Sequence, residues 1–185
     1  MDTGLIARRY ARALAGFAES NAEMTRTAEE AAAFVAAYAR IGELREALLS
    51  PVMDPDAKVS VARQALGGEI SGSFEGFLRL VIRHRREKWI CFMLPAFIGI
   101  YKQLYGIVDM TLTTAAPVDE DFVDRLSAHV GIETHSREVH VHRRIDPALI
   151  GGFRFRIDDR LLDASIATQL RRIELNLGSQ PERKL

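Results

Sequence analysis

The sequence has a single cysteine and no excess of charge of either sign. Cys91 cannot form a disulfide within the chain, which is typical of a protein from a reducing compartment. Its position in an apolar run favours a small buried core residue over a nucleophile. The charges of the 25 basic and 25 acidic residues cancel. Residues before Gly106 include 14 of the basic and 12 of the acidic ones, so neither part of the chain is strongly charged. Because phosphate binding needs a basic face, no nucleic acid partner is expected.

No apolar run is long enough to span a membrane. The longest covers residues 89–101 and contains Pro95 and Gly99, whereas a spanning helix needs about 20 apolar residues. No signal peptide follows Met1. The sequence therefore predicts no direct membrane insertion, so that any association with a membrane would come through a partner.

Nucleotide-binding loops and catalytic signatures are also missing. Gly151-Gly152 matches neither GxGxxG nor GxxxxGK[ST], and it precedes a predicted strand. Glycine at such a place favours a close backbone approach or a positive φ. Asp163 lies just before a predicted helix, where a negative charge suits the amino end. No Ser/His/Asp or Cys/His arrangement has a recognisable flanking signature, and no cofactor is expected.

Up to residue 105 the apolar residues recur at helical spacing. Asp54-Pro55 and Ser71 are typical helix starts, and Gly67-Gly68 is a typical stop. The expected helices cover residues 3–21, 24–40, 43–49, 55–66, 71–82 and 86–105. Short connections indicate a compact bundle.

After Gly106 the pattern changes to short strands and helices. Period-two alternation predicts strands over residues 107–114, 138–144, 153–157 and 161–163. Helices are expected over residues 117–130 and 166–177, followed by a frayed tail at 178–185. The predicted fold class is mainly α: a six-helix amino-terminal bundle (1–105) plus a small α/β carboxyl-terminal domain (106–185).

Two alternative functions are open on the residues alone. A metal-dependent enzyme would use the closely spaced histidines His135, His140 and His142, but strand-face histidines two apart are common without metal, and no metal is expected. An RNA-binding helical adaptor would use the basic residues of the run 83–88, namely Arg83, Arg85, Arg86 and Lys88. Such a run more commonly forms a solvent-exposed junction between two helices than a binding site.

Residues 145–153 and 159–170 resemble the carboxyl-terminal signature of ATP synthase delta subunits, the bacterial counterparts of the mitochondrial oligomycin-sensitivity-conferring protein. The signature includes Gly151, Gly152, Asp163 and Ser165. Residues 7–14, 49–51, 77–81 and 106–115 are similar to the family in the same order, so the resemblance covers nearly the whole chain. The chain departs from the family at Asp158 and Ala164, where glycine is frequent.

The resemblance implies a non-catalytic stator connector of a bacterial F-type ATP synthase. Such a subunit links the catalytic head to the peripheral stalk, so that rotation is coupled to ATP synthesis and proton transport. Residues 1–105 would bind amino-terminal helices of the alpha subunits, and residues 106–185 would bind the b subunits of the stalk. The protein would lie at the cytoplasmic face of the bacterial cell membrane, peripheral through the complex.

The resemblance also implies a partner-binding groove between the first and fifth helices. On this chain it points to Ala7, Tyr10, Ala11 and Leu14, with Phe77, Leu80 and Val81 opposite. A stripe of alanines lets a foreign helix approach closely, and Tyr10 would supply a rigid anchor. Bundle core has the same periodicity, so it accounts for some of these residues equally well. Ala11→Trp is expected to weaken binding and leave the fold intact.

Overall fold

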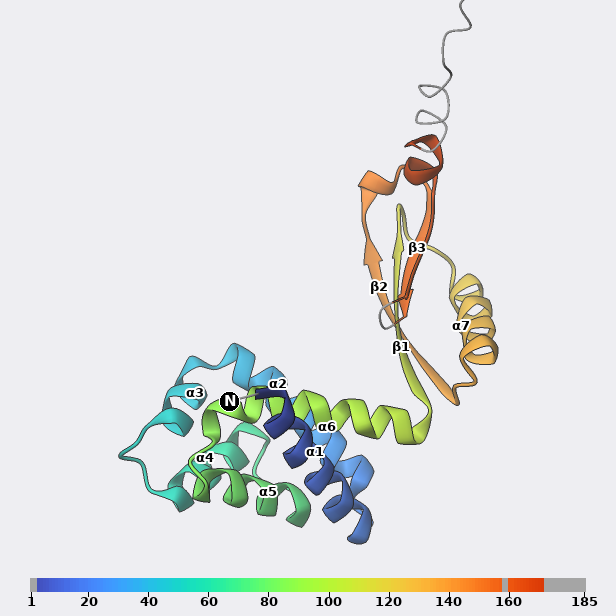
Figure 1. Cartoon of the computed structure of the whole chain (residues 1–185). Helices are drawn as coiled ribbons and strands as arrows, with labels where there is room; N and C mark the ends of the chain where they lie inside the picture. The colour runs from blue at the N-terminus through green and yellow to red at the C-terminus, as the bar shows by residue number, and fades with distance from the viewer. Residues whose placement is uncertain (1–2, 158–159, 172–185) are drawn as a thin grey trace, which may run out of the picture. The chain divides into compact units, whose positions relative to one another are not determined.

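The structure is a computed structural model that describes residues 3–157 and 160–171 (Figure 1). The chain divides into two compact units, residues 1–104 and residues 105–185. The prediction of a mainly helical protein with a small sheet is confirmed. Within the described ranges, no helix has both the length and the apolar character that crossing a bilayer requires.

The helices of the first unit follow the spacing of apolar residues closely. They are α1 (Thr3–Ser20), α2 (Met24–Arg40), α3 (Gly42–Leu49), α4 (Pro55–Ala65), α5 (Gly72–Arg83) and α6 (Ile90–Tyr105). The last helix differs from expectation at its start, where the first turn is a separate 3-10 turn, η1 (Glu87–Trp89).

Helix boundaries in this unit have local causes. The Asp54 carboxylate accepts a hydrogen bond from the Asp56 amide (3.0 Å), and Pro55 occupies the first helical position of α4. That helix ends where Gly68, at φ +102°, donates to the Arg63 carbonyl (3.0 Å). Arg85, at φ +54°, has the same left-handed conformation after α5.

The core of the first unit is built on large apolar side chains from α2, α3, α5 and α6. Phe34 and Phe74 are fully buried, and their ring centroids lie 5.7 Å apart in an edge-to-face arrangement. The α6 residues that face this core are Ile90, Met93, Leu94 and Phe97. Burial of these residues fixes α6 in the bundle and leaves its other side to solvent.

The apolar segment 89–101 is therefore both core and surface. Phe92 is 53% exposed, and Pro95 and Gly99 are exposed. Cys91 is only partly buried, with its Sγ 3.6 Å from the Lys88 carbonyl oxygen. The prediction of a buried core cysteine is corrected, because this position falls at the edge of the buried stripe.

The second unit contains a four-stranded sheet with the order β2-β1-β3-β4. Its elements are β1 (Ile107–Thr114), α7 (Glu120–Thr134), β2 (Glu138–Ile145), the 3-10 turn η2 (Pro147–Leu149), β3 (Gly152–Ile157) and β4 (Arg160–Ser165). β1 and β2 are parallel and joined through α7, whereas β1–β3 and β3–β4 are antiparallel. Residues 166–171 are helical, and the rest of the predicted final helix and tail lies outside the described residues.

The two faces of this sheet differ, as the alternation predicts. Met110 and Leu112 of β1 are buried, and Phe153 of β3 packs edge-on against Phe122 of α7, with ring centroids 5.7 Å apart. Helix α7 therefore covers the apolar face (Figure 1).

Helix α7 begins and ends about three residues later than expected. Gly131, which follows the last residue of the predicted helix, lies inside α7, and a Cβ there would be in ordinary contact with Val139 at 3.7 Å. The helix ends instead at His135, whose backbone is left-handed (φ +54°). Strand β4 is also longer than the predicted 161–163, because Gly152 pairs with Ser165 and extends the ladder.

Candidate functional site

An apolar groove runs between α1 and α5, which pack side by side in the first unit (Figure 1). The two helices are antiparallel along it, because Phe17 near the end of α1 meets Gly76 near the start of α5, whereas Tyr10 meets Arg86 just beyond the end of α5. The surfaces of both helices therefore contribute to the groove along its length.

The groove has two adjoining sections. The apolar section has a volume of about 250 Å³ and is lined by Ala13, Leu14, Phe17, Gly76, Phe77 and Leu80. The second, of about 300 Å³, is lined by Arg9, Tyr10, Ala13, Leu80, His84 and Arg86. Ala13 and Leu80 line both sections, so the groove is continuous. Phe17 is 47% exposed and Leu80 is 40% exposed, and exposed large apolar groups in a concave surface are typical of a binding site.

The structure places the seven predicted groove residues in two groups. Leu14, Phe77, Leu80 and Tyr10 line the groove. Ala7, Ala11 and Val81 are buried in the core of the bundle and line neither section. The alanine stripe thus packs against this protein's own helices.

Ala11 needs a further correction. It is 0% exposed, so a tryptophan at this position has no room and would disrupt the core instead of leaving the fold intact. Ala13, two residues further on, is exposed and lies in the groove. The resemblance pointed to α1, but two of the four residues chosen on that helix, Ala7 and Ala11, lie on its buried side.

The groove residues that sequence reasoning missed are Arg9, Ala13, Phe17, Gly76, His84 and Arg86. Phe17 was available as a signal, since it continues the spacing of Tyr10 and Leu14 on α1. Gly76 could not be found in this way: its helical backbone is ordinary, and a Cβ there would lie 3.2 Å from the Phe17 ring. Its role is to leave space beside Phe17.

Tyr10 is not a projecting anchor. It is 8% exposed, and its hydroxyl accepts a hydrogen bond from Arg86 Nη1 at 3.2 Å. The Arg86 guanidinium carbon lies 5.3 Å from the centre of the Tyr10 ring, a cation–π distance. Tyr10 therefore holds Arg86 at the end of the groove.

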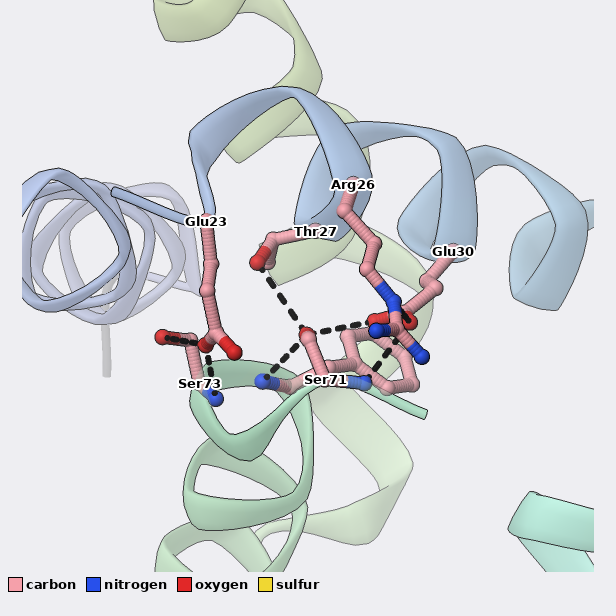
Figure 2. Close-up of polar contacts among 7 residues, drawn as sticks. Glu23, Arg26, Thr27, Glu30, Ser71 and Ser73 are labelled. Carbon is pink, nitrogen blue, oxygen red and sulfur yellow. Dashed lines mark hydrogen bonds and ion pairs between the residues drawn. The ribbon is translucent and has the colours of Figure 1, made fainter. Parts of the chain in front are cut away.

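A set of polar contacts fixes the amino end of α5 against α2 (Figure 2). Glu30 accepts hydrogen bonds from the Ser71 amide (2.7 Å) and the Ser71 hydroxyl (2.6 Å). The same hydroxyl oxygen caps α5 by accepting from the Phe74 amide at 3.2 Å. Arg26 bonds Glu30 at 3.1 Å. The Ser71 and Phe74 amides at the start of α5 and the Glu30 carboxylate therefore all have hydrogen-bond partners.

Glu23 repeats this arrangement one step further along α5. It accepts from the Ser73 hydroxyl (2.6 Å) and the Ser73 amide (2.8 Å). These bonds hold the pKa of Glu23 below its ordinary value, because they stabilise the ionised carboxylate. The bond from the Ser73 hydroxyl has the larger effect and the bond from the Ser73 amide the next. Two carboxylates, Glu30 of α2 and Glu23 immediately before that helix, thus position α5, and with it one wall of the groove.

In the second unit the signature residues meet at one corner of the sheet. The Asp163 carboxylate accepts from the Ser165 hydroxyl (2.6 Å), the Ser165 amide (3.0 Å), Thr168 Oγ1 (3.0 Å) and Arg154 Nε (3.0 Å). These donors, led by the Ser165 hydroxyl, hold the pKa of Asp163 far below its ordinary value. Asp163 therefore ties β3, β4 and the helical residues after Ser165 together.

The two signature glycines lie at the same corner. A Cβ on Gly152, which has φ +75°, would lie 2.3 Å from the Ala164 carbonyl oxygen. A Cβ on Gly151 would meet Ile166 Cδ1 at 2.6 Å, and the Gly151 carbonyl accepts from the Ile166 amide at 3.0 Å. The expectation of close backbone approach is confirmed, and Ala164 is part of β4 here, paired with Phe153.

The three histidines of the alternative metal site do not converge on one point. His135 ends α7, whereas His140 and His142 each have a ring nitrogen 3.8 Å from Asp109 Oδ1. Within the described part of the chain, no group of three or more His, Cys, Asp or Glu side chains could hold a metal ion.

The basic residues of the alternative RNA site are dispersed. Arg86 lies on Tyr10, Lys88 lies over the Trp89 ring at 5.0 Å, and Arg85 lines a separate cavity. That cavity also contains an ion pair that the sequence did not indicate, between Lys58 and Glu87 at 2.7 Å, with both residues buried.

The fold and the groove define a class: two-unit proteins in which a helical unit with an apolar groove precedes a small mixed sheet. Residues 6–177 match the family described as ATP synthase delta (OSCP) subunit. The chain is 38% identical to ATP synthase subunit delta of Phocaeicola vulgatus over 94% of both chains. It is 33% identical to that of Parabacteroides distasonis over 96% of this chain and 98% of that protein.

Among solved structures, a chain of the mitochondrial ATP synthase hexamer of Toxoplasma gondii is similar in fold. Its TM-score is 0.71 at 17% identity, with 95% of this chain and 98% of that chain covered. The present chain belongs to the ATP synthase delta (OSCP) subunit family.

Proposed function

We propose that this chain is the non-catalytic stator connector of a bacterial F-type ATP synthase. Family membership makes it a structural subunit, and the connecting role follows from what such a complex needs. Rotation of the central shaft exerts torque on the catalytic head, and a stator must prevent the head from turning with it. The chain would link the head to the peripheral stalk at the cytoplasmic face of the membrane, and so couple rotation to ATP synthesis and proton transport.

The observation that carries this proposal is the continuous groove between α1 and α5. It exposes Phe17 and Leu80 in a concave, mainly apolar surface, which suits the apolar stripe of an amphipathic helix. The six-helix unit would use it to hold the amino-terminal helix of an alpha subunit. Slow dissociation matters more than fast association here, because the joint must outlast many turnovers.

The second unit would bind the carboxyl end of the b subunits. The Asp163 corner supports this assignment indirectly, since it fixes the end of β4 and the start of the following helix. Apolar side chains remain exposed around that corner, among them Ile150 (69%), Ile166 (43%) and Leu170 (47%). These are the groups that a stalk helix would cover.

The test is the variant Leu80→Asp, measured in the full chain by titration calorimetry with a peptide of the alpha-subunit amino-terminal helix. Leu80 is 40% exposed in the centre of the groove, so aspartate there is tolerated by the free protein and places an unpaired charge in the apolar interface. We expect affinity to fall by about 100-fold, or roughly 3 kcal/mol.

Val52→Asp is the matched control. Val52 is 91% exposed and outside the groove, so the same added charge should leave affinity within about twofold. Equal affinities for the two variants, with unchanged circular dichroism, would remove the groove from the proposed function.

A further inference from the structure

The groove between α1 and α5 changes character along its length. Around Phe17 and Gly76 it is apolar, whereas around Tyr10 it is lined by Arg9, His84 and Arg86. Among residues 3–157 and 160–171, none of these three side chains forms an ion pair with a carboxylate. Lys58, which lines a different cavity, is by contrast paired with Glu87.

Arg86 is the one of the three that contacts Tyr10. It is partly buried, its guanidinium lies over the Tyr10 ring, and within the described residues its side chain donates a hydrogen bond to a neutral group, the Tyr10 hydroxyl. A guanidinium has five donors in a planar fork that matches a carboxylate. Because Tyr10 already holds Arg86 in place, little side-chain entropy remains to be lost when an anionic group arrives.

The charges of the two helices reinforce this asymmetry. Helix α1 carries Arg8, Arg9 and Arg12 in its first half and Glu19 in its second. Because α5 runs antiparallel to α1, Arg83 near its end falls at the same end of the groove as these arginines. The Glu23 carboxylate lies beside Gly72 at the opposite end. The groove is thus cationic at one end and acidic beyond the other.

We propose that the helix bound in this groove carries a carboxylate side chain over Arg9, His84 and Arg86, and that this pairing fixes which end of the helix lies there. The inference rests on the proposed function of the groove and specifies the chemistry of its occupant. The apolar section supplies most of the affinity, because it removes Phe17 and Leu80 from water. The cationic section determines direction and register, as charge complementarity commonly does at interfaces.

The experiment uses the full chain and the alpha-subunit peptide. Arg9→Glu reverses a charge in the groove, and Arg8→Glu makes the same change at the neighbouring exposed residue, which does not line it. We expect Arg9→Glu to weaken binding about tenfold and Arg8→Glu by at most about twofold. Circular dichroism and thermal melting check that both variants fold.

A charge swap then locates the partner group. Each acidic residue of the peptide is replaced in turn by lysine, and one of these peptides should bind Arg9→Glu better than it binds the unaltered chain. Equal losses for Arg8→Glu and Arg9→Glu, or no peptide that recovers affinity, would overturn the charge pairing.

The two proposals fail in different ways. If Leu80→Asp abolishes binding while Arg9→Glu behaves like Arg8→Glu, the groove binds the helix through apolar contacts alone and only the charge pairing is refuted. If the unaltered peptide does not bind the unaltered chain, the proposed function of the groove is refuted and the pairing with it.

Discussion

Of the glycines at positive φ in residues 3–157 and 160–171, Gly152 should be the one whose replacement by alanine is most destabilising. The position combines two costs. Its φ of +75° disfavours any side chain by about 1–2 kcal/mol. In addition, the new Cβ would lie 2.3 Å from the Ala164 carbonyl oxygen and 3.1 Å from Ser165 Cα. Both are backbone atoms, so neither contact can be relieved by a rotamer change.

Overpacking of this kind costs about 1–3 kcal/mol more, so the total is about 2–5 kcal/mol. The free energy of unfolding of a whole domain is on the order of 5–15 kcal/mol, so this loss is a large part of the stability of a small unit. Gly68→Ala is the matched control. Its φ of +102° is equally unsuited to alanine, but nothing lies within 4 Å of the new Cβ. The difference between the two variants therefore isolates the contact with β4.

Hydrogen exchange measured by mass spectrometry reports each unit separately. Gly152→Ala should speed exchange in β3 and β4 and leave α1 and α5 unchanged, and the affinity for the alpha-subunit peptide should stay the same. If Gly152→Ala costs no more than Gly68→Ala, the close approach of β3 and β4 at this corner is not what requires glycine.

Two further predictions concern the first unit. Lys58→Met should leave the buried Glu87 carboxylate without its cation and cost about 3–5 kcal/mol in urea unfolding followed by Trp89 fluorescence, whereas adding Glu87→Leu should recover most of that loss; a single variant as stable as the double would contradict this. Glu23 has a folded pKa below its ordinary 4.5, so its bonds to Ser73 stabilise the fold above that pH and are lost as pH falls through the lower folded value. Glu23→Gln should therefore flatten the acid limb of the stability profile below about pH 4.5, and an unchanged slope would show that another carboxylate governs it.

The sequence alone determined the helices, the strands and their ends with small errors. Apolar spacing, Asp54-Pro55, Ser71 and Gly67-Gly68 are local signals, and local interactions are enough to produce the corresponding structure. The errors were at the ends of α7 and β4. Strand β4 is longer than predicted because Gly152 of β3 pairs with Ser165, and alternation within one strand does not show such a pairing between strands.

The candidate site was predicted only in outline. The sequence indicated α1 and α5 and four of the residues that line the groove. Ala7, Ala11 and Val81 proved to be core, because periodicity shows that a helix has an apolar stripe and not which neighbour covers it. Exposure of Phe17, Leu80 and Ala13 depends on how α1 and α5 pack.

Contacts between distant segments were decided by the tertiary structure alone. Glu30 and Ser71 are 41 residues apart, and Lys58 and Glu87 are 29 apart. Neither separation corresponds to the three- or four-residue spacing of a helix or the two-residue spacing of a strand, so the sequence pattern gives no sign of these contacts. The sequence therefore determined the elements and the family, because both reside in local patterns. The groove, its cationic end and the contacts that hold α5 in place arise only when those elements pack, because each requires side chains from different helices to meet.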